Sequence, residues 1–75
     1  MSSIKEVIMK ELNSLAKNLK ELRTQTGLTQ KEVASRLGIA YQSYQAYELG
    51  ITVPTLQNFI KLAKLFDISY EDLLN

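Results

Sequence analysis

Residues 29–50, TQKEVASRLGIAYQSYQAYELG, constrain the fold most, because they encode two short helices separated by one tight turn. Thr29 is a good N-cap, and Glu32, three residues later, completes a capping box at the start of the first helix. Gly38 follows the last apolar residue of that helix, where a helix end often needs a positive φ. The sequence therefore predicts two consecutive helices, at about 29–37 and 40–49.

The apolar residues of these two segments recur with helical spacing, so each predicted helix has one face to bury. Ala34 is small at the point where the second helix must cross the first closely. Two short helices joined by a turn that contains glycine describe a helix-turn-helix. The residues that we expect to face inward are Val33, Ala34, Leu37, Ile39, Tyr44 and Tyr47.

The same stretch resembles the helix-turn-helix of the lambda-repressor/Cro family. The shared features are the inward apolar residues, the small Ala34 and the residues Gly38, Glu48 and Gly50. The resemblance covers roughly residues 13–75 and also includes the segments Gly27-Leu28-Thr29-Gln30, Pro54-Thr55-Leu56, Ala63-Lys64-Leu65 and Asp72-Leu73-Leu74. It implies an all-α, five-helix DNA-binding domain at 13–75, preceded by a helical extension at 1–12.

The first predicted helix runs from about Ser3 to Gln25. It begins with a Ser3–Glu6 capping box, and its apolar residues follow steps of three and four without interruption. A helix break at Asn13-Ser14 is the alternative, because both residues cap helices well. Three interpretations remain open for the apolar residues of the extension: packing on the domain's own core, contact with a second chain, or a frayed end. These residues are Ile4, Val7 and Ile8.

The second helix of the helix-turn-helix is the predicted recognition helix. Its outward face carries two amides and a phenol but no charge, which suits base reading better than solubility. A glutamine amide can donate and accept at once to adenine N6 and N7, and alanine can contact a thymine methyl group. We expect the base-reading residues to be Tyr41, Gln42, Gln45 and Ala46, with Gln42 the strongest candidate; the resemblance implies the same for all of them except Gln45, which flanks the set.

Residues for the phosphate backbone are expected around the same helix. Gln30 lies in the first turn of the preceding helix, where the family places a residue against the DNA backbone that also braces the recognition helix. A solvated side chain is the alternative at each of these positions. Phosphate would repel the carboxylate of Glu48, so we expect a structural role for it, either in a hydrogen bond or in a pair with Arg23. The candidate backbone contacts are Gln30, Ser43, Lys31, Arg36 and Lys61.

The segment after the helix-turn-helix predicts two more helices. One runs from an N-cap at Thr55 to about Phe66, with an inward stripe from Leu56 onward, and a short one follows the N-cap Ser69. Asn58 and Lys61 are expected to be exposed. The loop at 51–53 has apolar residues where many relatives carry a basic phosphate clamp, and these either cover the core or contact a second copy. The candidate homodimer contacts are Ile4, Val7, Ile8, Ile51, Val53, Leu73 and Leu74.

Composition excludes several classes of function. The chain has 75 residues, 45% of them apolar, which is typical of one globular domain. It contains no cysteine and no histidine, so the sequence predicts no disulfide, no zinc or thiolate site, no cofactor and no enzyme activity. Its short apolar runs predict no membrane span and no signal peptide. The net charge of +1 is low for a nucleic-acid binder.

We therefore expect a sequence-specific regulator of transcription, acting as a repressor, that binds double-stranded DNA as a homodimer. The resemblance implies a prokaryotic or phage-encoded protein of the cytoplasm, such as a phage repressor, a restriction-modification controller or an antitoxin. The alternative is a protein-interaction module that uses the same fold. The low net charge and the apolar loop favour this alternative, whereas the uncharged face of the recognition helix opposes it.

Overall fold

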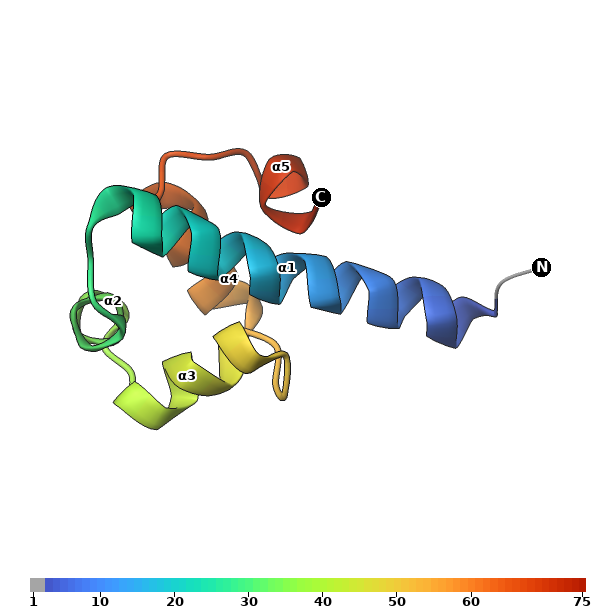
Figure 1. Cartoon of the computed structure of the whole chain (residues 1–75), viewed down its shortest axis with the longest axis horizontal. Coiled ribbons are helices and arrows are strands. Elements are labelled where there is room, and N and C mark those ends of the chain that lie inside the picture. Colours follow the sequence, from blue (N-terminus) through green and yellow to red (C-terminus); the bar gives the residue numbers. More distant parts are fainter. Residues whose placement is uncertain (1–2) are drawn as a thin grey trace.

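A computed structural model describes residues 3–75, which form five helices joined by short turns (Figure 1). The all-α prediction is confirmed, and the predicted helix bounds agree closely with the observed ones. None of the helices formed by these residues is both long and apolar enough to span a lipid bilayer. The helices are α1 (Ile4–Thr26), α2 (Gln30–Leu37), α3 (Tyr41–Leu49), α4 (Leu56–Leu65) and α5 (Tyr70–Leu74).

Helix starts follow the predicted caps. The Thr29 hydroxyl accepts from the Glu32 N–H at 3.1 Å, and the Glu32 side chain accepts from the Thr29 N–H, so the capping box is complete. At the start of α1, the first half of the predicted box forms, because Ser3 accepts from the Glu6 N–H. Gly38 ends α2 with φ at +72°, a left-handed conformation that glycine adopts without strain.

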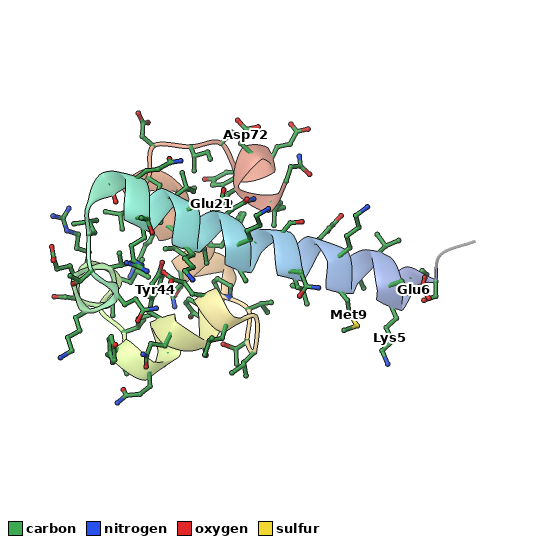
Figure 2. All side chains as sticks on the ribbon, viewed as in Figure 1. Lys5, Glu6, Met9, Glu21, Tyr44 and Asp72 are labelled. Carbon is green, nitrogen blue, oxygen red and sulfur yellow. The ribbon has the colours of Figure 1, made fainter. Side chains whose placement is uncertain are left out.

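The first helix is continuous, so the predicted alternative of a break at Asn13-Ser14 is wrong. Its C-terminal half packs in the bundle, whereas its N-terminal half extends past the other helices (Figure 1). We call the protruding residues 4–12 the N-terminal arm; Lys5, Glu6 and Met9 mark it in Figure 2. Folding of the arm over the domain's own core is contradicted by three exposed fractions: 80% for Ile4, 48% for Val7 and 50% for Ile8.

The core lies where α3, α4 and α5 converge on the second half of α1. Leu19 of α1, Tyr44 of α3, Leu62 of α4 and Leu73 of α5 are each fully buried in it. A chain of this size buries only about 60% of its unfolded surface, so such central residues carry much of the stability. The buried apolar cluster comprises Leu15, Leu19, Val33, Ala34, Leu37, Tyr44, Tyr47, Leu62, Ala63, Phe66 and Leu73.

Three apolar residues of α4 and α5 differ from what the sequence predicted. Leu56 is 74% exposed rather than inward, because it begins α4 and the buried residues of that helix lie in its second half. Leu62, which was expected only to widen the inward stripe, is at its centre. Leu73 is a core residue, so it is not available for a homodimer contact, and Leu74 packs partly buried against the same core.

Candidate nucleic-acid interface

The predicted recognition helix, α3, is held in the bundle by its two inward tyrosines. Tyr44 is fully buried, Tyr47 is 8% exposed, and their rings meet edge to face with centroids 6.1 Å apart. Such aromatic pairs contribute about 0.5–1.5 kcal/mol beyond the burial of their area. Because these two residues face inward, the opposite side of α3 is presented to solvent, as the sequence predicted.

The solvent side of α3 is less uniform than the sequence suggested. Gln42 and Ser43 are exposed, whereas Tyr41, Gln45 and Ala46 are only partly exposed. The amide of Gln45 donates to the Tyr41 hydroxyl oxygen at 2.9 Å. Gln42 forms no hydrogen bond with any residue in 3–75, so its amide is the one on this face that is wholly available to a ligand.

Gln30 connects α2 to both ends of α3. Its amide nitrogen donates to Glu48 Oε1 at 3.0 Å. Its amide oxygen accepts from the Tyr41 hydroxyl at 3.3 Å and from the Gln45 amide at 3.4 Å. The expected bracing of the recognition helix by Gln30 is therefore present. The spacing of these residues in the sequence gives no sign that Tyr41 and Gln45 share one acceptor.

A buried ion pair anchors the same network to α1. Arg23 donates from Nε to Glu48 Oε2 at 2.6 Å and from Nη2 to Oε1 at 3.1 Å, which confirms the expected pair. Only 3% of the Glu48 side chain is exposed. Burial alone raises the pKa of the Glu48 carboxyl, but the hydrogen bonds from Arg23 and Gln30 outweigh it and lower the pKa below the ordinary 4.5.

The hydroxyls of the two inward tyrosines have different surroundings. The Tyr44 hydroxyl is buried beside the Arg23–Glu48 pair and makes no hydrogen bond with any described residue. Burial first, and then the neighbouring carboxylate, raise the pKa of Tyr44 far above its ordinary value. The Tyr47 hydroxyl accepts from Asn58 at 3.2 Å, so Asn58 is partly buried and not the exposed residue that was predicted.

The candidate phosphate-binding cations lie on α2 and α4. Lys31 and Arg36 are exposed on α2, and the Lys31 ammonium lies 5.5 Å from the centroid of the Tyr41 ring. This distance is within the range of a cation–π contact, which favours a Lys31 position beside the recognition helix. Lys61 is exposed on α4, and its ammonium donates to the carbonyl of Leu37 at 3.4 Å, at the negative end of α2.

An apolar surface follows the recognition helix. Ile51 and Val53 are 72% and 50% exposed, so they do not cover the core, which was one of the two predictions for them. Leu49 and Leu56 are exposed on either side of them, and neither was among the predicted homodimer contacts. We call these residues the apolar loop patch: Leu49, Ile51, Val53 and Leu56.

The loop patch lies next to the root of the N-terminal arm. At Gly50, a Cβ atom would stand 3.7 Å from the Ala16 Cβ and 3.8 Å from the Asn13 Oδ1, both on α1. The patch and the arm are therefore neighbours on one side of the bundle.

Comparison with known proteins places the chain in a family. A helix-turn-helix family profile matches residues 19–73. The HTH-type transcriptional regulator YqaE of Bacillus subtilis is 41% identical over 59 residues, which are 79% of this chain and 51% of that protein. The cryptic phage CTXphi transcriptional repressor RstR of Vibrio cholerae is 35% identical over 57 residues, 76% of this chain and 51% of that protein. The chain thus spans about half the length of these curated relatives.

A solved structure shows the same fold. The restriction-modification controller protein C.AhdI of Aeromonas hydrophila superposes with a TM-score of 0.75 and 34% identity, over 83% of this chain and 94% of that one. The match confirms the expected resemblance to the lambda-repressor/Cro type. With the family profile covering most of its length, the chain belongs to the helix-turn-helix family.

Proposed function

We propose that the chain is a transcriptional regulator that binds specific double-stranded DNA sequences by inserting α3 into the major groove. The observation that carries this proposal is the exposed, unengaged amide of Gln42 on a helix that buried contacts hold in position. The relatives named as transcriptional regulators and repressors support it. Regulation as a repressor in the cytoplasm of a prokaryotic or phage-infected cell follows by analogy with them.

Residue roles divide by the atoms that they contact. Base edges would be read by Gln42, with Tyr41, Gln45 and Ala46 beside it. Phosphate oxygens would be bound by Gln30, Ser43, Lys31, Arg36 and Lys61, which sets the register without specifying the sequence. Because the net charge is only +1 and the loop patch is apolar, binding of this chain would release few counterions from the DNA. The DNA affinity of this chain should therefore depend on salt more weakly than is usual for DNA-binding proteins.

Selection from a random double-stranded DNA library, over a series of salt concentrations, tests the function. We expect one sequence to be enriched and Gln42→Ala to reduce its affinity about 5- to 150-fold, while binding to random DNA stays unchanged. Gln25→Ala, an exposed glutamine at the end of α1, is the matched control. The proposal fails if the wild-type chain enriches no sequence even at low salt.

A homodimer is the expected assembly on DNA. A two-fold pair would set two copies of α3 about 34 Å apart, in successive major grooves of a partly palindromic site. The neighbouring arm and loop patch supply exposed apolar contacts for it, and Leu74 lines a hollow with Val7 beside α1. The arm carries Lys5, Glu6, Lys10 and Glu11 and so has no net charge to repel a second copy. The candidate contacts that remain are Ile4, Val7, Ile8, Ile51, Val53 and Leu74.

Sedimentation equilibrium tests the homodimer. We expect a dimer for the wild-type chain and a monomer for the double variant Ile4→Lys, Ile8→Lys, because two charges would enter the apolar contact. Lys20→Ala, an exposed residue of α1 outside the arm, should stay dimeric. A wild-type monomer that selects a site without two-fold symmetry would contradict the dimer but leave DNA reading intact.

The same exposed arm favours a second candidate function. As a protein-interaction module that binds a partner in the manner of an antitoxin, the chain would contact a partner protein through the arm or the loop patch. This function predicts no enriched DNA sequence and a wild-type monomer that becomes a stoichiometric complex with its partner. The two measurements above therefore distinguish it from the DNA-binding regulator.

A further inference from the structure

One continuous set of hydrogen bonds links a buried carboxylate to the outer face of α3. Glu48 Oε1 accepts from the Gln30 amide nitrogen at 3.0 Å. The Gln30 amide oxygen accepts from the Tyr41 hydroxyl at 3.3 Å and from the Gln45 amide nitrogen at 3.4 Å. Gln45 also donates to the Tyr41 hydroxyl oxygen at 2.9 Å. The path therefore runs from the Arg23–Glu48 pair through α2 to the DNA-facing residues of α3.

The ionised carboxylate decides the direction of every bond along this path. A carboxylate only accepts hydrogen bonds, so the Gln30 amide must turn its nitrogen toward Glu48 and its oxygen toward α3. That oxygen in turn requires donors, which Tyr41 and Gln45 supply. Reversing the Gln30 amide would place its oxygen against the Glu48 carboxylate. The Arg23 guanidinium keeps Glu48 ionised and in place, with Nε 2.6 Å from Oε2.

This fixed direction limits which hydrogen-bonding groups of Gln45 remain available to a ligand. The Gln45 amide nitrogen lies within hydrogen-bond distance of two acceptors, the Tyr41 hydroxyl at 2.9 Å and the Gln30 amide oxygen at 3.4 Å, so the donor side of this amide is turned toward the protein. Its oxygen accepts no hydrogen bond from any residue in the described range 3–75. Gln45 therefore offers a ligand one acceptor, whereas the unengaged amide of Gln42 offers both a donor and an acceptor.

We propose that Glu48, a buried residue that does not face the DNA, determines base preference by making Gln45 an acceptor-only reader. This inference rests on the proposed DNA-binding function. An acceptor can bond the exocyclic amino group of adenine (N6) or cytosine (N4) in the major groove, and it is repelled by guanine O6 and thymine O4. At the base pair that faces Gln45, the contacted strand should thus carry adenine or cytosine. Gln42 reads adenine in the bidentate mode.

Two variants break the path at different points. Tyr41→Phe removes the hydroxyl that receives one Gln45 N–H, and it leaves the Arg23–Glu48 pair intact. Glu48→Gln keeps the shape but replaces the acceptor-only group with one that also donates, so the Gln30 amide is free to reverse. In both variants Gln45 can turn an N–H toward the base, and guanine or thymine becomes acceptable at that base pair.

The experiment is selection from a random double-stranded DNA library with the wild-type chain, the two variants, Gln45→Leu and the control Gln25→Ala. We expect wild type to exclude guanine and thymine about tenfold at one base pair of each half-site. Tyr41→Phe and Glu48→Gln should remove that exclusion, and Gln45→Leu should remove all preference there. The base pair read by Gln42 should be unchanged in every variant, and thermal unfolding identifies any loss through instability.

The outcomes separate the inference from the function that it rests on. If wild type enriches no site, the DNA-binding function itself fails, and this inference with it. If wild type enriches a site but folded Glu48→Gln keeps the wild-type preference at every base pair, the control by Glu48 is overturned and DNA reading stands. Loss of affinity that is equal for all sequences in Glu48→Gln would likewise overturn it, because that result indicates a purely structural role for Glu48.

Discussion

Arg23 and Glu48 bring two nitrogens of the guanidinium against both oxygens of the carboxylate, at 2.6 Å and 3.1 Å. The pair joins α1 to the last turn of α3, and the remaining Arg23 nitrogen, Nη1, donates to the carbonyl of Leu28 at 3.1 Å. One side chain thereby connects α1, the turn before α2 and α3.

Loss of one partner of this pair should destabilise the fold strongly. We expect Arg23→Met to lower the free energy of unfolding by about 3–5 kcal/mol, because it leaves the Glu48 carboxylate buried without its counter-ion. The double variant Arg23→Met, Glu48→Met should recover part of that loss. Urea unfolding measures both, with Lys20→Met as an exposed control on α1. A change below about 0.5 kcal/mol for Arg23→Met would show that the pair is dispensable.

Acid should weaken the fold through Glu48. Its pKa in the folded chain lies below the ordinary 4.5, so the unfolded chain binds more protons in that interval. The stabilisation is therefore fully present above about pH 4.5 and is lost as the pH falls toward the folded-state pKa. Urea unfolding between pH 3 and pH 7 should show this slope in wild type and a shallower one in Glu48→Gln. Equal slopes would assign the acid sensitivity to other carboxylates.

The turn of the helix-turn-helix should tolerate only residues that accept a positive φ. Gly38 has φ at +72°, and nothing lies within 4 Å of where its Cβ would be, so substitution there changes backbone strain and not packing. We expect Gly38→Ala to lower the free energy of unfolding by about 1 kcal/mol and Gly38→Asn to lower it less. Thermal unfolding can rank the two, with the exposed helical Ser35→Ala as control. Equal losses for alanine and asparagine would argue against this explanation.

Phosphate contact by the α2 cations predicts a change in salt dependence. Removing one contact should make the slope of log K against log salt shallower by about one, with similar loss on all sequences. We expect this for Lys31→Ala and for Arg36→Ala, measured by fluorescence anisotropy on the selected site. Lys64→Ala is the matched control, because Lys64 lines a hollow with Ser69 and Tyr70 near α5, on the side of α1 away from α3 (Figure 1). An unchanged slope means that the removed charge is only solvated.

Local features of the fold were predictable because they depend on neighbouring residues. A hydroxyl at Thr29 or Ser69 caps the helix that it begins, whatever the rest of the chain does. The apolar spacing along α1 predicted one long helix, and the inward spacing of Tyr44 and Tyr47 predicted which side of α3 faces solvent. An electrostatic argument about phosphate predicted a structural role for Glu48, whereas it did not by itself identify Arg23 as the partner.

Features that depend on what covers a side chain were not predictable in the same way. Leu56 continues the inward spacing of α4, yet it is 74% exposed. Asn58 has a polar side chain of the kind usually found on the surface, yet its amide donates a hydrogen bond to the Tyr47 hydroxyl. Spacing gives the direction of a side chain around its own helix but not the position of the neighbouring helices.

The sequence by itself determined the five helices, their caps and the inward tyrosines, because each follows from periodicity and local chemistry. Only the tertiary structure decided that the arm is uncovered and that the amide donors of Gln45 are engaged by Tyr41 and Gln30. Hydrogen-bond direction along that path depends on a carboxylate three residues further along α3, held by an arginine on another helix. Such a relation exists only once the helices are packed together.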